Sequence, residues 1–374
     1  MELGFLNAVY AAGGPCACAY LDTSRDTESS ERAMVLRRRQ ICAALTEQGA
    51  DAATVDAVAA VAGSDRGIAG RHGQAIVAHG GQVVLTEELP RPPERDQATF
   101  TALPDLMPLA VQYAPDIRYV AATVHSLPDP QRELPDVLEV AFQAGTWPSS
   151  AVAPGDCHRA TGSAVGWSSG ARHAAERIVE LAGRNDAETI VLSGITWARE
   201  VLADQLSTRW RRRLVTTSGD GYPPRPGRAL MEDTLAEVFQ GQLRTADRAR
   251  LDLFLSRRTS GHGAVEGLPD VVAALRRSHV AALLLNDPVH FPAQLQVDAG
   301  AAPSDLPEAA REPYGALSFH AGPAHAAVIR AAVRTGAELV VVPQHELALA
   351  DGVGALLRYA GPQRTALFAR PAHR

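Results

Sequence analysis

The sequence predicts an α/β protein made of three consecutive domains. The chain has 374 residues, and chains of this length usually form more than one domain, each with its own hydrophobic core. Short apolar runs typical of buried strands alternate with amphipathic helical patterns along its length. A hydrophobic fraction of 46% and a charged fraction of 21% are those of a globular protein. The pattern places the domains at residues 1–112, 113–258 and 259–374.

The first predicted domain contains a strand, two helices and a hairpin. The strand covers Cys16–Leu21, and amphipathic patterns predict helices over Thr27–Glu47 and Ala52–Ala62. Two short apolar runs lie within residues 75–85, on either side of Gly80-Gly81. Glycine pairs suit tight two-residue turns because both positions need positive φ, so the two runs are expected to form a hairpin.

The second predicted domain alternates strands and helices after an antiparallel strand pair. The pattern predicts the pair at Arg118–Val124 and Val137–Phe142, and then a loop over Gly145–Gly170. This order of elements is typical of an α/β layer. The elements expected after the loop are a helix at 171–182, a strand at 189–192, a helix at 198–206, a strand at 214–217 and a long helix at 231–255.

The third predicted domain opens with a helix at 271–275 that leads into a buried strand at 280–285. A second helix, at 324–335, precedes an apolar strand at 339–342. Residues 294–313 are rich in alanine, proline and acids, which indicates a loop or mobile insertion.

Several chemistries are excluded by residue usage. All 36 basic residues are arginine, so the lysines of Walker-A loops, kinases and Schiff-base enzymes are missing. The four cysteines, at positions 16, 18, 42 and 157, lack the paired spacing of a zinc site. We therefore predict no cofactor and no metal.

No stretch reaches the roughly 20 apolar residues that a membrane span needs. Residues Met1–Tyr10 contain no basic residue, unlike a secretory signal. We expect a cytoplasmic protein without a membrane partner.

Arginines gather in one stretch of the second domain, Gln205–Arg228. This stretch contains six arginines and a single acid, Asp220, so its local net charge is +5. Charges are screened beyond roughly 10 Å at moderate salt, so a chain with a net charge of −6 can still bind RNA locally. The RNA contacts that we predict here are Arg209, Arg211, Arg212, Arg213, Arg225 and Arg228.

A second tract surrounds the predicted loop. From Gly145 to Ala175 the only acid is Asp156, while aromatic and basic residues are frequent. Such a tract suits stacking on bases and contact with phosphates, or it is a surface loop that its tryptophans anchor to the domain. The RNA contacts that we predict here are Arg159, Trp167, Arg172 and His173.

The segment 351–359, Asp-Gly-Val-Gly-Ala-Leu-Leu-Arg-Tyr, carries a family resemblance. Its two glycines suit a bulge or a close backbone approach in a short strand, because no helix opens behind them as a phosphate loop requires. It resembles the Gly-Ile-Gly-Gly-Ile-Leu-Arg-Tyr ending of archaeal and eukaryotic release factor 1 and Pelota. The whole chain resembles the bacterial branch of that superfamily, which includes actinobacterial release-factor-like proteins and the ribosome hibernation factor Balon.

This resemblance implies a ribonuclease-H-like middle domain and a C-terminal domain like that of archaeal and eukaryotic release factor 1. It also implies a tRNA-shaped molecule that binds ribosomal RNA in the A site. Because the C-terminal domain of the superfamily docks a translational GTPase, elongation factor Tu is an expected partner. No DNA partner is expected.

Release factors hydrolyse peptidyl-tRNA with a Gly-Gly-Gln loop in the middle domain. This chain has Gly80-Gly81-Gln82 in the first domain, inside the predicted hairpin, and none in the 145–170 loop. We therefore predict no catalytic residue and a factor that occupies the ribosome, for hibernation or at stalled ribosomes. Codon-specific termination is not expected, since the stop-codon motif of the family contains a lysine.

Two alternative functions stay open on sequence grounds. The first is a peptidyl-tRNA hydrolase that uses a group of the 145–170 loop, with His158 as the candidate. The second is an α/β binding protein unrelated to translation.

Overall fold

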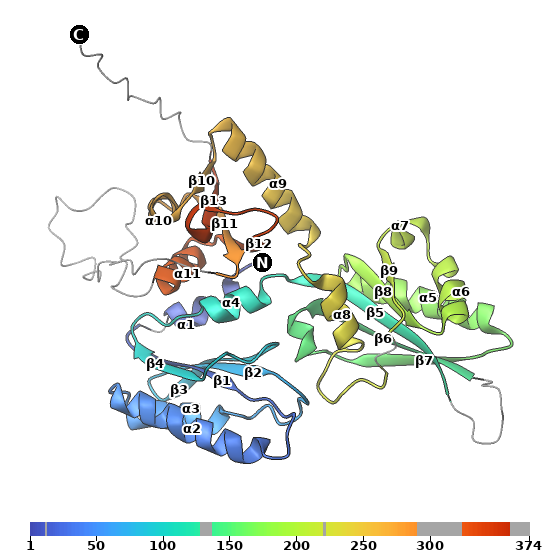
Figure 1. Cartoon of the computed structure of the whole chain (residues 1–374), viewed down its shortest axis with the longest axis horizontal. Coiled ribbons are helices and arrows are strands. Elements are labelled where there is room, and N and C mark those ends of the chain that lie inside the picture. The colour runs from blue at the N-terminus through green and yellow to red at the C-terminus, as the bar shows by residue number, and fades with distance from the viewer. Residues whose placement is uncertain (12, 128–136, 220–221, 290–323, 360–374) are drawn as a thin grey trace, which may run out of the picture. The chain divides into compact units, whose positions relative to one another are not determined.

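The computed structural model describes residues 1–11, 13–127, 137–219, 222–289 and 324–359, which form three β-sheets (Figure 1). The chain divides into two compact units. The first unit consists of Met1 and residues 8–245, and the second of residues 2–7 and 246–374. The first unit holds two sheets and the second unit holds one, so the α/β prediction is confirmed.

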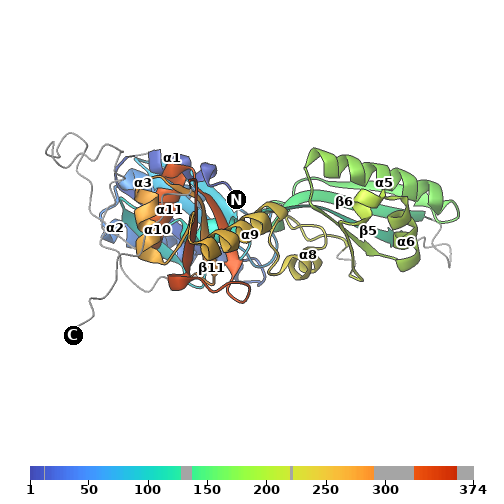
Figure 2. The ribbon, with the colours of Figure 1, turned by 90° about the horizontal axis from the view of Figure 1, so that it is seen from above.

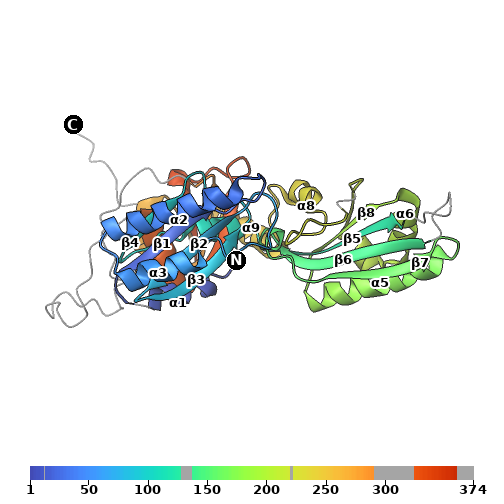
Figure 3. The ribbon, with the colours of Figure 1, turned by 90° about the horizontal axis from the view of Figure 1, so that it is seen from below.

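The first sheet has the strand order β3-β2-β1-β4 and pairs antiparallel throughout. Two helices, α2 and α3, cover one of its faces (Figure 3), where Leu21, Leu45 and Val58 are buried together. On the other face the Tyr20 hydroxyl donates to the Asp105 carbonyl at 2.7 Å. The elements are β1 (Cys16–Asp22), α2 (Ser30–Glu47), α3 (Ala52–Val61), β2 (Gly73–His79), β3 (Gln82–Leu89), β4 (Gln97–Thr101) and α4 (Met107–Tyr113).

The Gly-Gly-Gln tripeptide forms the turn of the β2–β3 hairpin. Gly80 and Gly81 have φ values of 54° and 79°, as a two-residue turn of this kind requires. The Gly81 N–H donates to Thr54 Oγ1 at 3.0 Å, which fixes the turn against the start of α3. The hairpin prediction is confirmed, and the turn accounts for both glycines.

The middle sheet has the order β7-β6-β5-β8-β9. Strands β5, β6 and β7 pair antiparallel, while β8 and β9 run parallel to β5. This arrangement agrees with the ribonuclease-H-like order of elements that we expected. The elements are β5 (Ile117–Ser126), β6 (Val137–Trp147), β7 (Cys157–Ser163), α5 (Trp167–Arg184), β8 (Thr189–Gly194), α6 (Thr196–Gln205), α7 (Thr208–Arg211), β9 (Leu214–Thr216) and α8 (Glu232–Phe239).

Both faces of the middle sheet are covered. Helices α5 and α6 bury one face, where Phe142, Ile178 and Leu202 share a core. Helix α8 and the segment that leads into it bury the other, through Phe239 and Leu230 respectively. Figure 2 shows α5 and α8 on opposite sides of the strands.

Two predictions for this region are wrong. The expected loop over 145–170 is replaced by the end of β6, a short 3-10 turn (Ser149–Ala151), the edge strand β7 and the first turn of α5. The expected long helix over 231–255 is broken at residues 240–244, where Gly241 has a φ of 66°. Its second half is α9 (Thr245–Ser260), which belongs to the second unit.

The two sheets of the first unit meet through backbone contacts. The Ala69 N–H donates to the Pro226 carbonyl at 3.0 Å. A side chain at Gly227 would meet Gly67 O at 2.6 Å, so only glycine allows this approach. The connection between α3 and β2 is thereby joined to the segment that precedes α8.

The sheet of the second unit has the order β10-β13-β11-β12. Helix α10 leads into β11 as predicted, and β11 pairs parallel to β12 and antiparallel to β13. The elements are β10 (Ala264–Glu266), α10 (Leu268–Arg276), β11 (Val280–Asp287), α11 (Ala324–Thr335), β12 (Glu338–Pro343), a 3-10 turn (Ala350–Gly352) and β13 (Val353–Leu357). The predicted insertion over 294–313 lies outside the described residues.

The 351–359 segment forms a short strand with a close backbone approach, as predicted. A side chain at Gly354 would meet the Phe254 ring at 3.0 Å. Asp351 Oδ2 accepts the Leu268 N–H at the start of α10, at 3.1 Å. The Arg358 guanidinium donates to the carbonyls of Thr335 and Gly336 at the end of α11, so this arginine supports the fold.

Candidate nucleic-acid interface

Four of the predicted RNA contacts are exposed arginines on either side of Trp210. Arg209, Arg211, Arg212 and Arg213 are all exposed, and they occupy α7 and the two residues before β9. We call these four residues the arginine surface.

The Trp210 ring packs against two arginines of the arginine surface. Its indole is only 7% exposed and packs in the core beneath α5 and α6. The guanidinium carbons of Arg209 and Arg213 lie 5.2 and 5.6 Å from the centre of its ring. Cation–π contact holds both guanidinium groups close to the ring without neutralising their charge.

Counter-charges near the arginine surface are weak. The one ion pair recorded for it within the described residues joins Arg211 to Asp204 at 3.9 Å, and both side chains are well exposed. A pair at this distance and exposure contributes little. The surface therefore keeps a positive potential that phosphate groups can neutralise.

The other two arginines of the same stretch lie elsewhere. Arg228 is only 7% exposed; its guanidinium binds the Glu232 carboxylate through two nitrogens and donates to Arg71 O at 3.2 Å. The RNA contact that we predicted for Arg228 is therefore wrong, because burial and pairing leave it a structural role. Arg225 is exposed and pairs with Asp233 at 3.1 Å.

The predicted tract around the supposed loop does not form one surface. Trp167 is 3% exposed, and its indole N–H donates to the Ala198 carbonyl at 2.8 Å. It belongs to the core and does not offer an exposed ring for stacking at the surface. Arg172 and His173 are exposed at the start of α5, whereas Arg159 is exposed on β7.

Arg159 covers a polar network that the sequence pattern does not indicate. Its guanidinium lies 5.5 Å from the Tyr222 ring, and that ring stacks on His125 with centres 3.6 Å apart. The buried Glu139 carboxylate accepts from the Tyr222 hydroxyl and lies against His125 Nε2, both at 2.8 Å. Burial, together with the hydrogen bond to Glu139, raises the pKa of Tyr222. These residues are separated by up to 97 positions, so spacing could not have revealed them.

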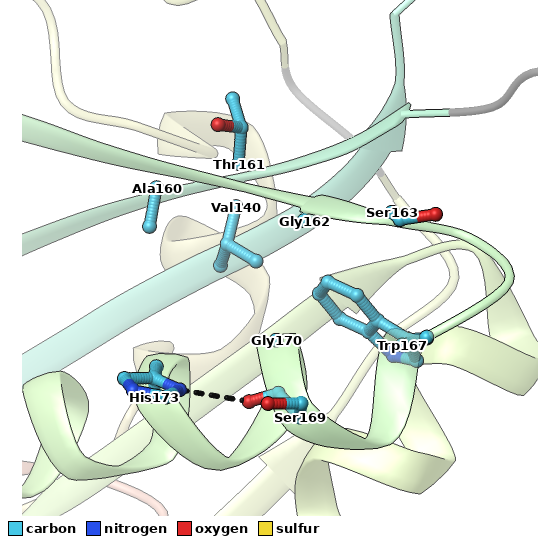
Figure 4. Close-up of a pocket in the computed structure, with 10 residues that line it drawn as sticks. Val140, Ala160, Thr161, Gly162, Ser163, Trp167, Ser169, Gly170 and His173 are labelled. Atoms are coloured by element: carbon cyan, nitrogen blue, oxygen red, sulfur yellow. Dashed lines mark hydrogen bonds between the residues drawn. The ribbon is translucent and has the colours of Figure 1, made fainter.

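A pocket of about 300 Å³ lies between β7 and the first turns of α5 (Figure 4). Ala160 and Val140 point into it from the sheet, and the Trp167 ring closes one end. His173 and Ser169 line it from α5, where His173 Nδ1 donates to Ser169 O at 3.0 Å. No aspartate or glutamate is among the residues that line it.

The cysteines are poor nucleophiles. Burial raises the pKa of Cys16 to about 11 and raises the pKa of Cys18, Cys42 and Cys157 as well. A raised pKa leaves little thiolate near neutral pH. In the part of the chain that the structure describes, no three His, Cys, Asp or Glu side chains gather as metal ligands would. Nor does any helix of that part have the length and apolar character to cross a membrane.

Comparison with known proteins indicates a release-factor-like middle region. Residues 118–260, from β5 to the end of α9, match the model of the bacterial archaeo-eukaryotic release factor family 2. Two relatives, both uncharacterized proteins from strains of Mycobacterium tuberculosis, are 27% identical over 386 residues, or 96% of this chain and 97% of theirs. The arginine surface, Arg159, Arg172 and His173 all lie inside the matched region.

Solved structures with low sequence identity are similar over most of the chain. Pelota from Archaeoglobus fulgidus is 12% identical over 95% of this chain and 91% of its own, with a TM-score of 0.39. Dom34 of S. cerevisiae is 11% identical over 78% and 81% of the two chains, with a TM-score of 0.36. A model of ribosome-bound archaeal Pelota and ABCE1 is 12% identical over 96% and 94%, with a TM-score of 0.38.

Proposed function

We propose that this chain is a non-catalytic translation factor that binds the bacterial ribosome through the arginine surface of its middle sheet. The observation that carries the proposal is the position of this surface. Four exposed arginines with one weak counter-charge lie within the region that matches a release-factor family. A release-factor-like region with an RNA-binding surface is what a ribosome-bound factor needs.

The proposal extends to the site and the occasion of binding. The chain would occupy the A site during hibernation or at stalled ribosomes, in the cytoplasm, as an actinobacterial relative of Balon. Elongation factor Tu would be the partner of the C-terminal sheet. These finer assignments rest on the sequence resemblance around residues 351–359.

Absence of catalysis is part of the proposal, and a release assay tests it. Gly80 and Gly81 form a two-residue turn that is held against α3, and Gln82 begins β3, so this backbone is not free to approach an ester. His158, the candidate of the hydrolase alternative, lies on β7 with its ring 6.3 Å from Phe142. We expect ribosomes with peptidyl-tRNA to release no peptide above background when the protein is added. Release that disappears in a Gln82→Ala variant would contradict this.

Co-sedimentation with empty bacterial ribosomes over a salt series tests the proposed binding. Four phosphate contacts to single-stranded RNA predict that log K falls by about 3 for each tenfold rise in salt. Affinity should therefore drop roughly 50-fold between about 50 and about 200 mM salt. Binding should approach one protein per ribosome at low salt. No binding at low salt would exclude the translation role.

A further inference from the structure

We infer that the pocket between β7 and α5 binds a single unpaired nucleobase of RNA. This inference rests on the proposed function and adds a specific ligand group to it. The arginine surface offers charge alone, whereas the pocket offers a shaped cavity. Its volume of about 300 Å³ is at the lower limit for ligand pockets, which suits one ring system rather than a large ligand.

The pocket exists because small residues line it. Ala160, Gly162 and Gly170 leave the space between strand and helix open (Figure 4). A side chain at Gly162 or Gly170 would meet the Trp167 ring at 3.3 or 3.1 Å, so these glycines also let the ring lie flat between strand and helix. The Trp167 N–H bond to Ala198 then fixes the ring as a rigid wall. A preformed wall lowers the entropic cost of binding.

The residues that line the pocket suit both the apolar faces and the polar edge of a base. Val140, Ala160 and Trp167 offer apolar contact to the faces of a ring. His173 and Ser169 offer polar atoms to its edge (Figure 4). The Ser169 carbonyl can only accept, so His173 Nδ1 donates to it, and in the neutral imidazole Nε2 then accepts from an amino group of the base.

The charges around the pocket favour an anionic nucleotide over a cationic ligand. The first turn of α5 contains no acid, and Arg172 is exposed next to His173. The N-terminal turn of this 18-residue helix lines the pocket, and no carboxylate is among the lining residues. The positive end of the helix would therefore stabilise a phosphate next to the bound base.

The test measures binding of a fluorescein-labelled oligoribonucleotide of ten nucleotides, with adenosine or uridine as the base, by fluorescence anisotropy. An abasic ribose–phosphate chain of the same length shows what the phosphates alone contribute. Ala160→Phe fills the pocket from the strand. Thr161→Phe is the matched control: Thr161 borders the pocket, but successive side chains of a strand point to opposite faces, and its side chain points away from the pocket in Figure 4.

We expect the wild type to bind one of the oligonucleotides at least tenfold more tightly than the abasic chain, as about one stacked base contributes. Ala160→Phe should lower this affinity to the abasic level, and Thr161→Phe should leave it unchanged. Equal affinities of the two variants, or of the abasic and base-carrying chains, would overturn the inference. If Ala160→Phe does not fold, Ser169→Leu fills the pocket from the exposed side of α5.

Ribosome co-sedimentation of the same variants separates this inference from the proposed function. The arginine surface follows the far end of α6, whose ten residues span roughly 15 Å, so pocket variants should retain ribosome binding. Ribosome binding without a base effect would overturn only the pocket. Absence of ribosome binding in the wild type would overturn the proposed function, whatever the oligonucleotides do.

Discussion

Replacing Gly194 by alanine should disrupt the middle sheet. Gly194 ends β8 with a φ of 97°, a conformation that costs an L-residue about 1–2 kcal/mol. A Cβ there would lie 2.0 Å from the Val124 carbonyl oxygen and 2.7 Å from its carbonyl carbon. These are backbone atoms of the central strand, which cannot move without separating β5 from β8. We expect the free energy of unfolding to fall by about 4 kcal/mol when strain and overpacking are added.

Gly183→Ala is the matched control for Gly194→Ala. Gly183 lies within α5, and a Cβ there meets nothing within 4 Å. Alanine in a helix should stabilise the protein by about 0.5–1 kcal/mol. Urea unfolding followed by tryptophan fluorescence compares the two, since all four tryptophans lie between residues 147 and 210. An unfolding midpoint of Gly194→Ala equal to that of the wild type would contradict the β5–β8 geometry.

Replacing Asp65 by asparagine should have the second largest effect. The Asp65 side chain is buried; it accepts the Thr23 hydroxyl at 2.5 Å and lies 2.9 Å from His72 Nε2. Arg25 stands 3.9 Å away on the other carboxylate oxygen. Removing one member of a buried ionic cluster leaves the others without compensation, so we expect a loss of about 3 kcal/mol. Asp65 and His72 also bracket residues 67–71, which contact the segment before α8, so both sheets of the first unit should loosen.

The effect of Asp65 should depend on pH in a defined direction. Burial raises its pKa, but hydrogen bonds from His72 and Thr23 and the charges of His72 and Arg25 outweigh burial, so the pKa in the folded protein lies below 3.8. A lowered carboxyl pKa contributes stability above the unfolded value, and this contribution is lost as pH falls through the folded value. The difference between wild type and Asp65→Asn should shrink as pH falls below about 4.

Asp56→Asn provides the control for this measurement. Asp56 is exposed on α3, the helix that covers the first sheet together with α2. Its replacement should change the free energy of unfolding by less than about 0.5 kcal/mol at any of these pH values. A wild-type advantage over Asp65→Asn that grows as pH falls below about 4 would show that the carboxylate is not stabilised in the fold.

Most helices and strands can be predicted from the sequence because the pattern of their own residues is enough to define them. The apolar runs of β5, β8 and β11 are buried on both faces, and short continuous apolar runs are typical of strands covered on both sides. The Gly80-Gly81 turn is predictable for a similar reason, since few residue pairs accept positive φ twice. Strand β7 was missed because its residues are small or polar, and pairing with β6 rather than its own pattern makes it a strand.

The candidate site was predictable only where its residues are neighbours in the chain. Arg209 to Arg213 lie within five positions, so the exposed cluster is visible in the sequence. The roles of Trp167 and Arg228 depend on partners 31 and 157 positions away, at Ala198 and Arg71. Residue type alone suggested exposed RNA contacts for both, whereas packing against other elements buries both side chains.

The most direct test of ribosome binding through the arginine surface is co-sedimentation of two charge-reversed variants with empty bacterial ribosomes. One variant changes Arg209, Arg211, Arg212 and Arg213 to glutamate. The other changes four exposed arginines in the part of the chain that forms the first sheet and its helices: Arg32, Arg38, Arg39 and Arg95. Each variant exchanges four positive for four negative charges, so both have a net charge of −6 − 8 = −14. We predict that the first variant stays in the supernatant at low salt while the second sediments with ribosomes like the wild type. Equal sedimentation of the two variants would contradict the account.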